Sequence, residues 1–302
     1  MDKKQMSTLF EEALHLDHPE ITEIRRTPGG MTNDSYFVTV NGEKYVVRIP
    51  GKGTDELMID RNAEKNNLIF GTKLGINPEL FYFDTESGIK ITRKLEDCRS
   101  LTPEMAREGK IMKKIIALFQ RLHFSEAKMK NRFDLFGLME HYEGLVQDVH
   151  PFMMEKIAKL KEEALVLKKV YEQMEVREAP CHIDTAPSNF LLDQNEQMYL
   201  IDWEYSGMFD PMWDLATLFE RLGFTKEEEL FFLKHYFERD PSEEEGQRIL
   251  LHKIFQDYLW SLWTIYKEAK GEDFGSVAME RIERAMRNIE EYHSIYGMDI
   301  VV

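Results

Sequence analysis

The residues of this chain best suited to chemistry lie in a polar loop and at the end of the strand pattern that follows it. Asp184 is followed five residues later by Asn189, and the next long apolar run ends at Asp202. A carboxylate in a loop can orient a hydroxyl group and accept its proton. An amide oxygen and a second carboxylate are hard ligands of the kind that Mg²⁺ prefers. The set therefore suits phosphoryl transfer, with Asp184 as the base and Asn189 and Asp202 as metal ligands.

A predicted β-hairpin connects the two expected metal ligands. Short strands are expected around 190–192 and 198–201, on either side of a polar turn. A hairpin returns the chain to the end at which it started, so it would bring Asp202 back to Asn189. Taken singly, an Asp in a loop is an ordinary turn residue, and an Asn before an apolar run is often a cap. At these spacings they have the layout of a kinase catalytic loop.

Three further polar residues near this loop are expected to have structural roles. His182 lies two residues before Asp184, where hydrogen bonds from it would hold the loop. Asp210 and Asp214 lie just before and within a predicted helix. We expect them to cap that helix and to brace the loop.

The N-terminal part of the chain has the features of a nucleotide site. A Gly-Gly-Met-Thr-Asn segment lies between predicted strands, and its backbone N–H groups could hold phosphates, although two glycines are also ordinary turn residues. The next strand places Arg48 where a protein kinase has its phosphate-pairing lysine, and an arginine can do that work. Its natural partner is Glu64, in the helical segment that follows. The expected nucleotide-binding residues are Gly30, Thr32, Asn33, Arg48 and Glu64.

The pattern of the sequence changes near residue 100. Before it, β-like runs dominate, and the turn Asn41-Gly42 joins two of them. One helical segment interrupts these runs, from about Glu56 to Gly71. After residue 100, the pattern is mostly helical, with Thr102 as an expected helix cap and a helix break expected at Gly223. We therefore predict an α+β fold with a small β-rich nucleotide-binding lobe, 1–97, and a larger, mainly helical lobe for catalysis and substrate binding, 98–302.

Composition narrows the possible partners. The chain has 302 residues and a net charge of −16, which argues against nucleic-acid and anionic-membrane partners and suits a small cationic ligand. Only Cys98 and Cys181 are present, which fits a reducing compartment better than a disulfide framework. No apolar run reaches about 18 residues, so no membrane insertion is expected. These features predict a cytoplasmic protein.

Four segments together resemble the choline/ethanolamine kinase family: GGMTN, YVVRIPG, CHIDTAPSNFLL and LIDWEYSGMFDPMWDLA. The resemblance runs from about Ile21 to Arg287. It implies a bilobal protein-kinase-like fold, with ATP and Mg²⁺ as cofactors. It also implies a small cationic amino alcohol, choline or ethanolamine, as the acceptor of the phosphoryl group.

The expected acceptor site combines residues from two segments. Glu204 and Tyr205 come directly after the predicted metal aspartate, and Trp260 and Trp263 lie three apart in a predicted helix. That helix is apolar almost all round, so the tryptophans alone would be interpreted as core residues. The resemblance implies instead that the tyrosine and the tryptophans line the choline pocket, where aromatic faces attract a quaternary ammonium ion.

Other acceptors and one other class of protein remain open. Ser276 and Met279 stand where several choline kinases have tyrosines, which weakens the case for choline against ethanolamine or another amine. An aminoglycoside phosphotransferase shares the same loop elements, and acidic runs near residues 227 and 243 keep an aminoglycoside possible. A non-catalytic pseudokinase is a third alternative. Retention of Asp184, Asn189 and Asp202 argues against it.

Overall fold

The computed structural model describes residues 1–27, 33–51 and 54–297. The chain divides into two compact units. Unit 1 contains Met1–Asn131 and Ala186–Gly207, and unit 2 contains Arg132–Thr185 and Met208–Val302. The boundary expected after residue 97 thus falls inside unit 1, and the chain changes unit between the expected base and the expected metal ligands.

Unit 1 is built on a five-stranded antiparallel sheet of order β1-β2-β3-β5-β4. Its strands are β1 (Ile21–Arg26), β2 (Asn33–Val40), β3 (Glu43–Pro50), β4 (Leu80–Phe83) and β5 (Lys90–Arg93). The predicted turn between β2 and β3 is confirmed, because Asn41 and Gly42 have φ angles of 51° and 83°. Both values suit the two-residue turns that match the twist of a hairpin.

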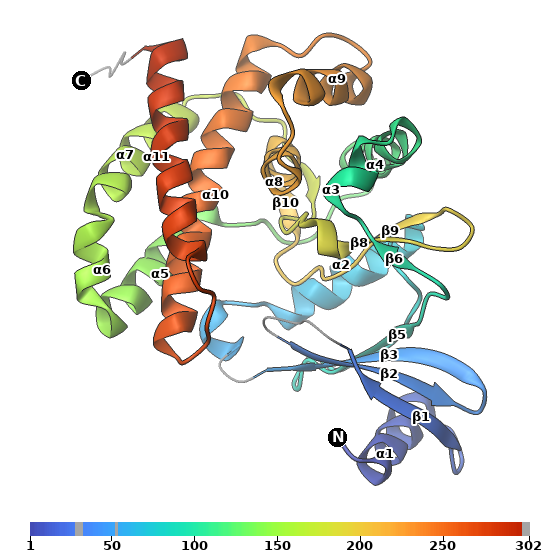
Figure 1. Cartoon of the computed structure of the whole chain (residues 1–302). Coiled ribbons are helices and arrows are strands. Elements are labelled where there is room, and N and C mark those ends of the chain that lie inside the picture. Colours follow the sequence, from blue (N-terminus) through green and yellow to red (C-terminus); the bar gives the residue numbers. More distant parts are fainter. Residues whose placement is uncertain (28–32, 52–53, 298–302) are drawn as a thin grey trace. The chain divides into compact units, whose positions relative to one another are not determined.

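One face of this sheet is covered by α1 (Lys3–Leu14), as Figure 1 shows. Met6 and Phe10 of the helix are fully buried against side chains of the sheet. Val38 and Val40 are two residues apart in β2 and so point to the same face. This layer fixes the sheet that carries Arg48.

The predicted catalytic hairpin belongs to unit 1. A three-stranded sheet of order β6-β8-β9 contains β6 (Arg99–Ser100), β8 (Phe190–Leu192) and β9 (Met198–Leu200). The short helix α3 (Pro103–Arg107) and the longer α4 (Gly109–His123) follow β6. Hydrogen bonds tie the hairpin to earlier segments, from Leu101 N to Phe190 O at 3.0 Å and from Leu200 N to Ile76 O at 2.7 Å. These bonds explain why unit 1 extends beyond residue 97.

The helix α2 (Arg61–Lys73) packs against Trp203, which directly follows the hairpin. Asp60 caps this helix by accepting hydrogen bonds from the N–H groups of Asn62 and Ala63. Trp203 is fully buried, and its indole N–H donates to Asn77 Oδ1 at 3.1 Å. A Cβ atom at Gly71 would lie 2.7 Å from Trp203 Cζ2. A glycine is therefore required where the helix meets the indole ring.

We expect Gly71→Ala to lower the free energy of unfolding by about 1–3 kcal/mol, because the buried indole would have to shift. The gain in helix propensity, about 1 kcal/mol, is too small to offset this overpacking. The matched control is Gly144→Ala in α5, an exposed helical glycine with nothing within 4 Å of an added Cβ. That variant should be stabilised. Urea denaturation of both variants checks the opposite signs, and a stabilised Gly71→Ala would contradict the packing described here.

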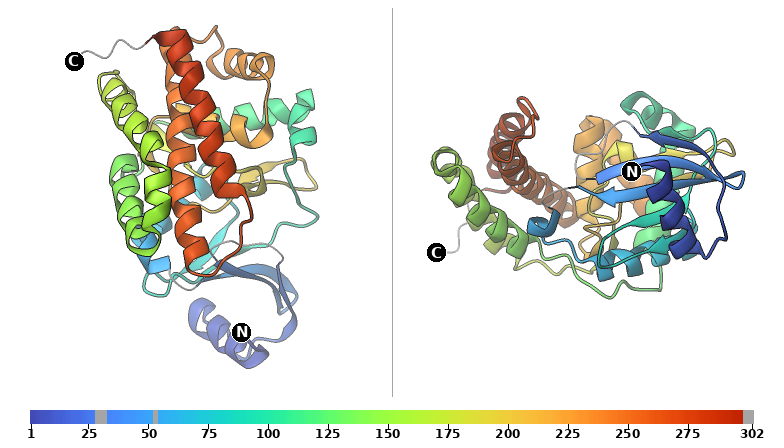
Figure 2. Two further views of the ribbon diagram at one scale, coloured as in Figure 1. Left: turned by 60° about the vertical axis from the view of Figure 1, so that its left-hand side comes forward. Right: turned by 90° about the horizontal axis from the view of Figure 1, so that it is seen from below.

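Unit 2 is mainly helical. Its helices are α5 (Leu135–Val149), α6 (Pro151–Lys156), α7 (Ala158–Tyr171), α8 (Met212–Leu222), α9 (Lys226–Phe237), α10 (Glu243–Ala269) and α11 (Val277–Tyr296). Two short strands, β7 (Ala179–Cys181) and β10 (Gly207–Phe209), pair beside them. The long helices α10 and α11 run side by side (Figures 1 and 2). The break predicted at Gly223 is confirmed, because this residue ends α8 with a φ of 59°.

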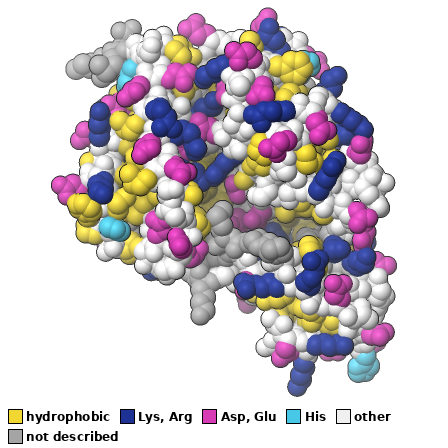
Figure 3. Space-filling view, viewed as in Figure 1, with side chains coloured by type: hydrophobic (Ala, Val, Ile, Leu, Met, Phe, Trp, Pro, Cys, Tyr) yellow, Lys and Arg dark blue, Asp and Glu magenta, His cyan; other side chains and the backbone are white. Residues whose placement is uncertain are grey.

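Charged side chains of both signs are interspersed over the face of the molecule seen in Figure 3. This mixture accompanies the net charge of −16. Within the described residues, no helix combines the length and the apolar character needed to cross a bilayer.

Candidate active site

Six charged side chains of unit 1 form one ion cluster. They are Arg48, Arg61, Glu64, Lys90, Asp202 and Glu204. The pair expected from the sequence lies at its centre, with Arg48 Nη2 at 2.6 Å from Glu64 Oε1. Both side chains are almost completely buried. Charges buried in this way need close partners, and the cluster supplies three cations for three carboxylates.

Arg48 links the helix α2 to the segment after the hairpin. Its Nη1 atom lies 3.0 Å from Asp202 Oδ1 and 3.2 Å from Glu204 Oε2. Arg61 adds a second link, because its Nη1 atom lies 2.7 Å from Glu64 Oε2 and 3.5 Å from Glu204 Oε2. The expected metal aspartate is therefore held beside the expected phosphate-binding arginine.

The cluster changes the pKa values of two of its carboxyl groups in opposite directions. Burial alone would raise the pKa of Glu64, but Lys90, Arg48 and Arg61 lower it to about 2. For Glu204, burial and the neighbouring charge of Asp202 raise the pKa to about 7, against the opposing effect of Arg48. Glu64 thus stays ionised at neutral pH as a fixed counter-charge for the three cations.

The hairpin places Asn189 and Asp202 at the same end of two paired strands. Phe190 pairs with Leu200, and Ile201 N donates to Asn189 O at 2.9 Å. Asp202 has a φ of 68°, a left-handed conformation that costs energy in a residue other than glycine. The amide oxygen of Asn189 and the carboxylate of Asp202 are hard donors, so this donor set fits Mg²⁺.

Asn33 begins β2 and reaches the ion cluster. Its Nδ2 atom lies 3.3 Å from Glu204 Oε2. Its buried Oδ1 atom has no hydrogen-bond partner within the described part of the chain. Gly30 and Thr32, the other expected members of this loop, lie outside the described residues.

Asp184 lies in unit 2, directly after a strained residue. Ile183 has a φ of 75°, which is rare for a β-branched side chain. The carboxylate of Asp214 holds this turn by accepting from His182 N at 2.7 Å and from Ile183 N at 2.8 Å. The indole N–H of Trp213 donates to Ile183 O at 2.9 Å. The expectation that Asp214 braces the loop is confirmed.

Asp210 lies just before α8, contacts its first turn and ties it to α10. Its Oδ1 atom accepts from Met212 N at 3.0 Å, but the N-cap residue of α8 is Pro211 rather than Asp210. The same carboxylate lies 2.8 Å from His252 Nε2 and 2.7 Å from Arg248 Nη1. Burial would raise the pKa of Asp210, but His252 and Arg248 lower it below its usual value. The acid is thus a permanent anion that anchors α10 beside the loop of Asp184.

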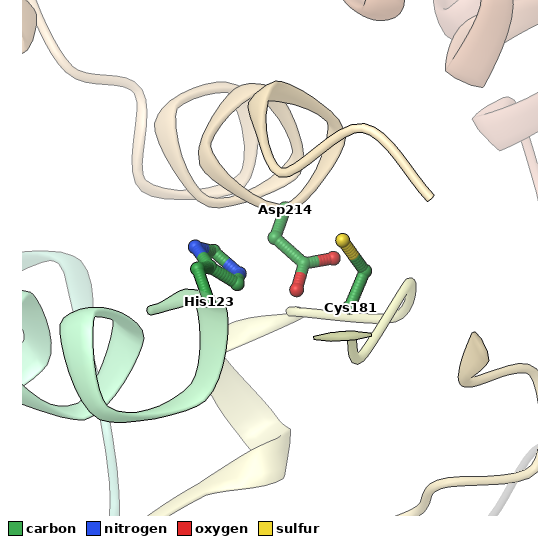
Figure 4. Close-up of side chains that lie close together, drawn as sticks. All are labelled: His123, Cys181 and Asp214. Atoms are coloured by element: carbon green, nitrogen blue, oxygen red, sulfur yellow. The ribbon is translucent and has the colours of Figure 1, made fainter. Parts of the chain in front are cut away.

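Cys181 is a buried thiol of unit 2 with no sign of reactivity. Figure 4 shows the Asp214 carboxylate beside the Cys181 sulfur. Burial, followed by the charges of Asp214 and Asp210, raises the pKa of this thiol well above its usual value. The other residue drawn there, His123 of α4, stacks on Phe119 within unit 1. Cys181 therefore remains protonated and acts as a small apolar core residue.

Trp260 and Trp263 are buried in α10, each with 8% of its surface exposed. The ring centroid of Trp263 lies 5.5 Å from that of Phe274. The ammonium group of Lys267 lies 5.9 Å from the Trp263 centroid, so the ring already attracts a cation. Among the described residues, the Trp263 indole N–H has no hydrogen-bond partner. Lys267 also pairs with Glu272. The assignment of Trp260 and Trp263 to the acceptor pocket stays a prediction.

Comparison with known proteins identifies the family. The model of the choline/ethanolamine kinase family matches residues 24–292. The chain belongs to this family. A curated relative, the protein LicA of Haemophilus influenzae, is 32% identical over 289 residues, which cover 93% of this kinase and 84% of the relative.

Solved structures of related proteins confirm the fold. The choline kinase LicA from Streptococcus pneumoniae is 35% identical, with a TM-score of 0.82, and the match covers 96% of this kinase and 99% of that chain. A LicA structure in complex with AMP is 34% identical, with a TM-score of 0.83 and coverage of 96% and 98%. The predicted α+β, bilobal protein-kinase-like fold and the kinase activity are thereby confirmed.

The structure of the kinase brings together most of the residues expected to bind the nucleotide and the metal. Asn33, Arg48, Glu64, Asp202 and Glu204 meet in the ion cluster of unit 1. Glu204, expected at the acceptor site, thus contacts Arg48 and Arg61 in that cluster, and Tyr205 is half-buried in the same unit. Asp184, Trp260 and Trp263 belong to unit 2.

Sequence reasoning missed Arg61, Lys90 and Phe274. Arg61 lies one turn before Glu64, a spacing at which opposite charges meet on a helix, so it could have been found. Lys90 gives no such signal, because its contacts depend on which strands pair. Phe274 lies in the Phe-Gly segment after α10, and only its contact with Trp263 marks it.

Proposed function

We propose that this kinase transfers the γ-phosphoryl group of ATP to the hydroxyl group of choline. The observation that carries the proposal is the contact of the buried Arg48 with both Glu64 and the partly exposed Asp202. A cation held by a helical glutamate beside a metal aspartate is what a kinase needs to bind nucleotide phosphates. Similarity to a choline kinase supports the choice of acceptor.

On the nucleotide side, Arg48 binds phosphate oxygens through its fork of N–H donors. Asn33, at the start of β2, supplies a further donor. Asn189 and Asp202 hold Mg²⁺ through oxygen atoms. When bound, Mg²⁺ neutralises part of the negative charge on the phosphates.

On the acceptor side, Asp184 orients the hydroxyl group and takes its proton. The hydroxyl oxygen forms a bond to the γ-phosphorus, and the bond between that phosphorus and the oxygen of ADP breaks. Asp214 keeps Asp184 in place by fixing the backbone of the two preceding residues. This support limits the motion of the base, and a base must be positioned before it can act.

Aromatic rings receive the trimethylammonium group. Choline has no N–H to donate, so it is recognised by ring faces and by nearby carboxylates. Trp260, Trp263 and Tyr205 supply the faces, and Phe274 supports the ring of Trp263. Glu204 is the proposed nearby carboxylate, and its raised pKa of about 7 leaves it only partly ionised at neutral pH.

An acceptor panel tests the proposal. The purified kinase is incubated with ATP, Mg²⁺ and either choline, ethanolamine or kanamycin, and ADP release is measured. We expect turnover with choline to exceed turnover with the other two. Higher turnover with ethanolamine would agree with Ser276 and Met279 in place of family tyrosines and would replace choline in the proposal. No turnover with any amino alcohol would contradict it.

We expect Trp263→Ala to raise KM for choline about tenfold or more, because a desolvated ring face holding a cation is lost. KM for ATP should remain within about twofold, since the change leaves the ion cluster of unit 1 intact. Trp263→Phe keeps a ring face and should show a smaller increase. Equal increases of both KM values, in a variant whose circular dichroism matches the parent, would show that Trp263 acts only in packing.

A further inference from the structure

We propose that Lys90 is a second cation of the nucleotide-phosphate site, acting beside Arg48. The inference rests on the proposed use of ATP and adds a residue that binds the phosphates of the nucleotide. It follows from strand register, from shared oxygen contacts and from the charge balance of the ion cluster.

Strand register makes Lys90 and Arg48 direct neighbours. The antiparallel pairing of β3 with β5 places Arg48 opposite Lys90. Side chains of directly opposed residues lie on the same face of a sheet, and their Cβ atoms are about 5 Å apart. Any anion that reaches the guanidinium group from this face is therefore also near the ammonium group.

Both cations approach the same two oxygen atoms. Arg48 lies 2.6 Å from Glu64 Oε1 and 3.0 Å from Asp202 Oδ1. Lys90 Nζ lies 3.1 Å from Glu64 Oε1 and 3.7 Å from Asp202 Oδ1. Lys90 thus repeats the contacts of the residue assigned to phosphate binding, and its ammonium group faces the expected metal ligand.

Charge balance gives a reason for a third cation. Glu64 already has two arginine partners, Arg48 at Oε1 and Arg61 at Oε2. Lysine is almost never fully buried unless it is paired, and Lys90, with only 7% of its surface exposed, is paired with Glu64 and Asp202. When Asp202 binds a metal ion, the metal compensates part of the negative charge of its carboxylate. Asp202 then neutralises Arg48 and Lys90 less. The two cations then favour an anionic group at that position, and each added phosphate increases the attraction.

A purely structural role predicts something different. If Lys90 only neutralised Glu64, its removal would change the stability of the protein. Any change in ligand affinity would then not depend on the number of phosphates on the ligand. If Lys90 binds phosphate, its removal weakens the binding of ATP more than the binding of adenosine. The ratio of the affinities for ATP and adenosine therefore separates the two roles.

The test uses the full chain and measures binding by calorimetry rather than activity. Lys90→Gln removes the charge but keeps an N–H donor for Glu64. Dissociation constants are measured for adenosine, AMP, ADP and ATP in the presence of Mg²⁺. For Lys90→Gln we expect the dissociation constant of ATP to rise about tenfold, which is typical for the loss of one charge-assisted contact. The dissociation constant of adenosine should stay within about twofold of the parent value. Lys90→Arg should have the same ratio of ATP affinity to adenosine affinity as the parent.

The matched control is Lys44→Gln, another strand lysine of the same sheet, whose side chain is 44% exposed and pairs with Glu96. It should leave all four constants unchanged. An unchanged ATP-to-adenosine ratio in Lys90→Gln overturns the role of Lys90. If that variant does not fold, Lys90→Arg decides, because an altered ratio in a variant that keeps the charge also overturns it. A parent that binds adenosine as tightly as ATP contradicts the proposed function itself.

Discussion

Replacing Asp184 with Asn is expected to lower kcat for choline phosphorylation by about 10²–10⁴-fold, the usual contribution of a general base. The amide cannot accept the proton of the hydroxyl group at neutral pH. The fold should survive, because the turn at Ile183 is held by Asp214 and Trp213 through backbone atoms. Steady-state kinetics at saturating ATP, Mg²⁺ and choline measure the effect.

A surface change of the same chemistry serves as the control for Asp184→Asn. Asp240 lies between α9 and α10, and its side chain is 79% exposed. Asp240→Asn should match the parent in kcat. If Asp184→Asn kept its rate within about tenfold of the parent, Asp184 would not be the base.

The second large effect is expected at Asp202. Asp202→Asn should lower kcat by about 10²–10³-fold, because it removes the only carboxylate of the proposed metal site. It also removes a counter-charge from Arg48, 3.0 Å away. Binding of ATP in the presence of EDTA should therefore stay equal to the parent or become tighter, whereas binding with Mg²⁺ should weaken.

This split between binding with and without metal distinguishes a metal ligand from a structural residue. A structural Asp202 would weaken ATP binding equally in EDTA and in Mg²⁺. Asp17→Asn, at an exposed aspartate of unit 1, should change neither binding nor rate. Parent-like turnover of Asp202→Asn at saturating Mg²⁺ would remove Asp202 from the metal site.

The local elements were predictable because each depends on short-range signals. The turn Asn41-Gly42, the cap at Thr102 and the break at Gly223 use residue types that favour those conformations. The hairpin between Asn189 and Asp202 followed from two short apolar runs around a polar turn. The pairing of Arg48 with Glu64 followed from the analogy with the kinase layout, which fixes a strand and a helix together.

Features that depend on long-range packing were not predictable. The register that places Lys90 opposite Arg48 joins strands that are far apart in sequence, and no local pattern specifies it. The hydrogen bonds that attach the hairpin to Ile76 and Leu101 likewise extend unit 1 beyond residue 97. The left-handed conformation of Ile183 contradicts the preference of a β-branched residue and depends on Asp214.

The most direct test of the central claim is identification of the product. Purified kinase is incubated with ATP, Mg²⁺ and choline, and the mixture is analysed by mass spectrometry and phosphorus NMR. We predict phosphocholine, with the phosphoryl group on the choline oxygen, formed in equal amount to ADP. ADP formation without phosphocholine, or no reaction at all, would contradict the account.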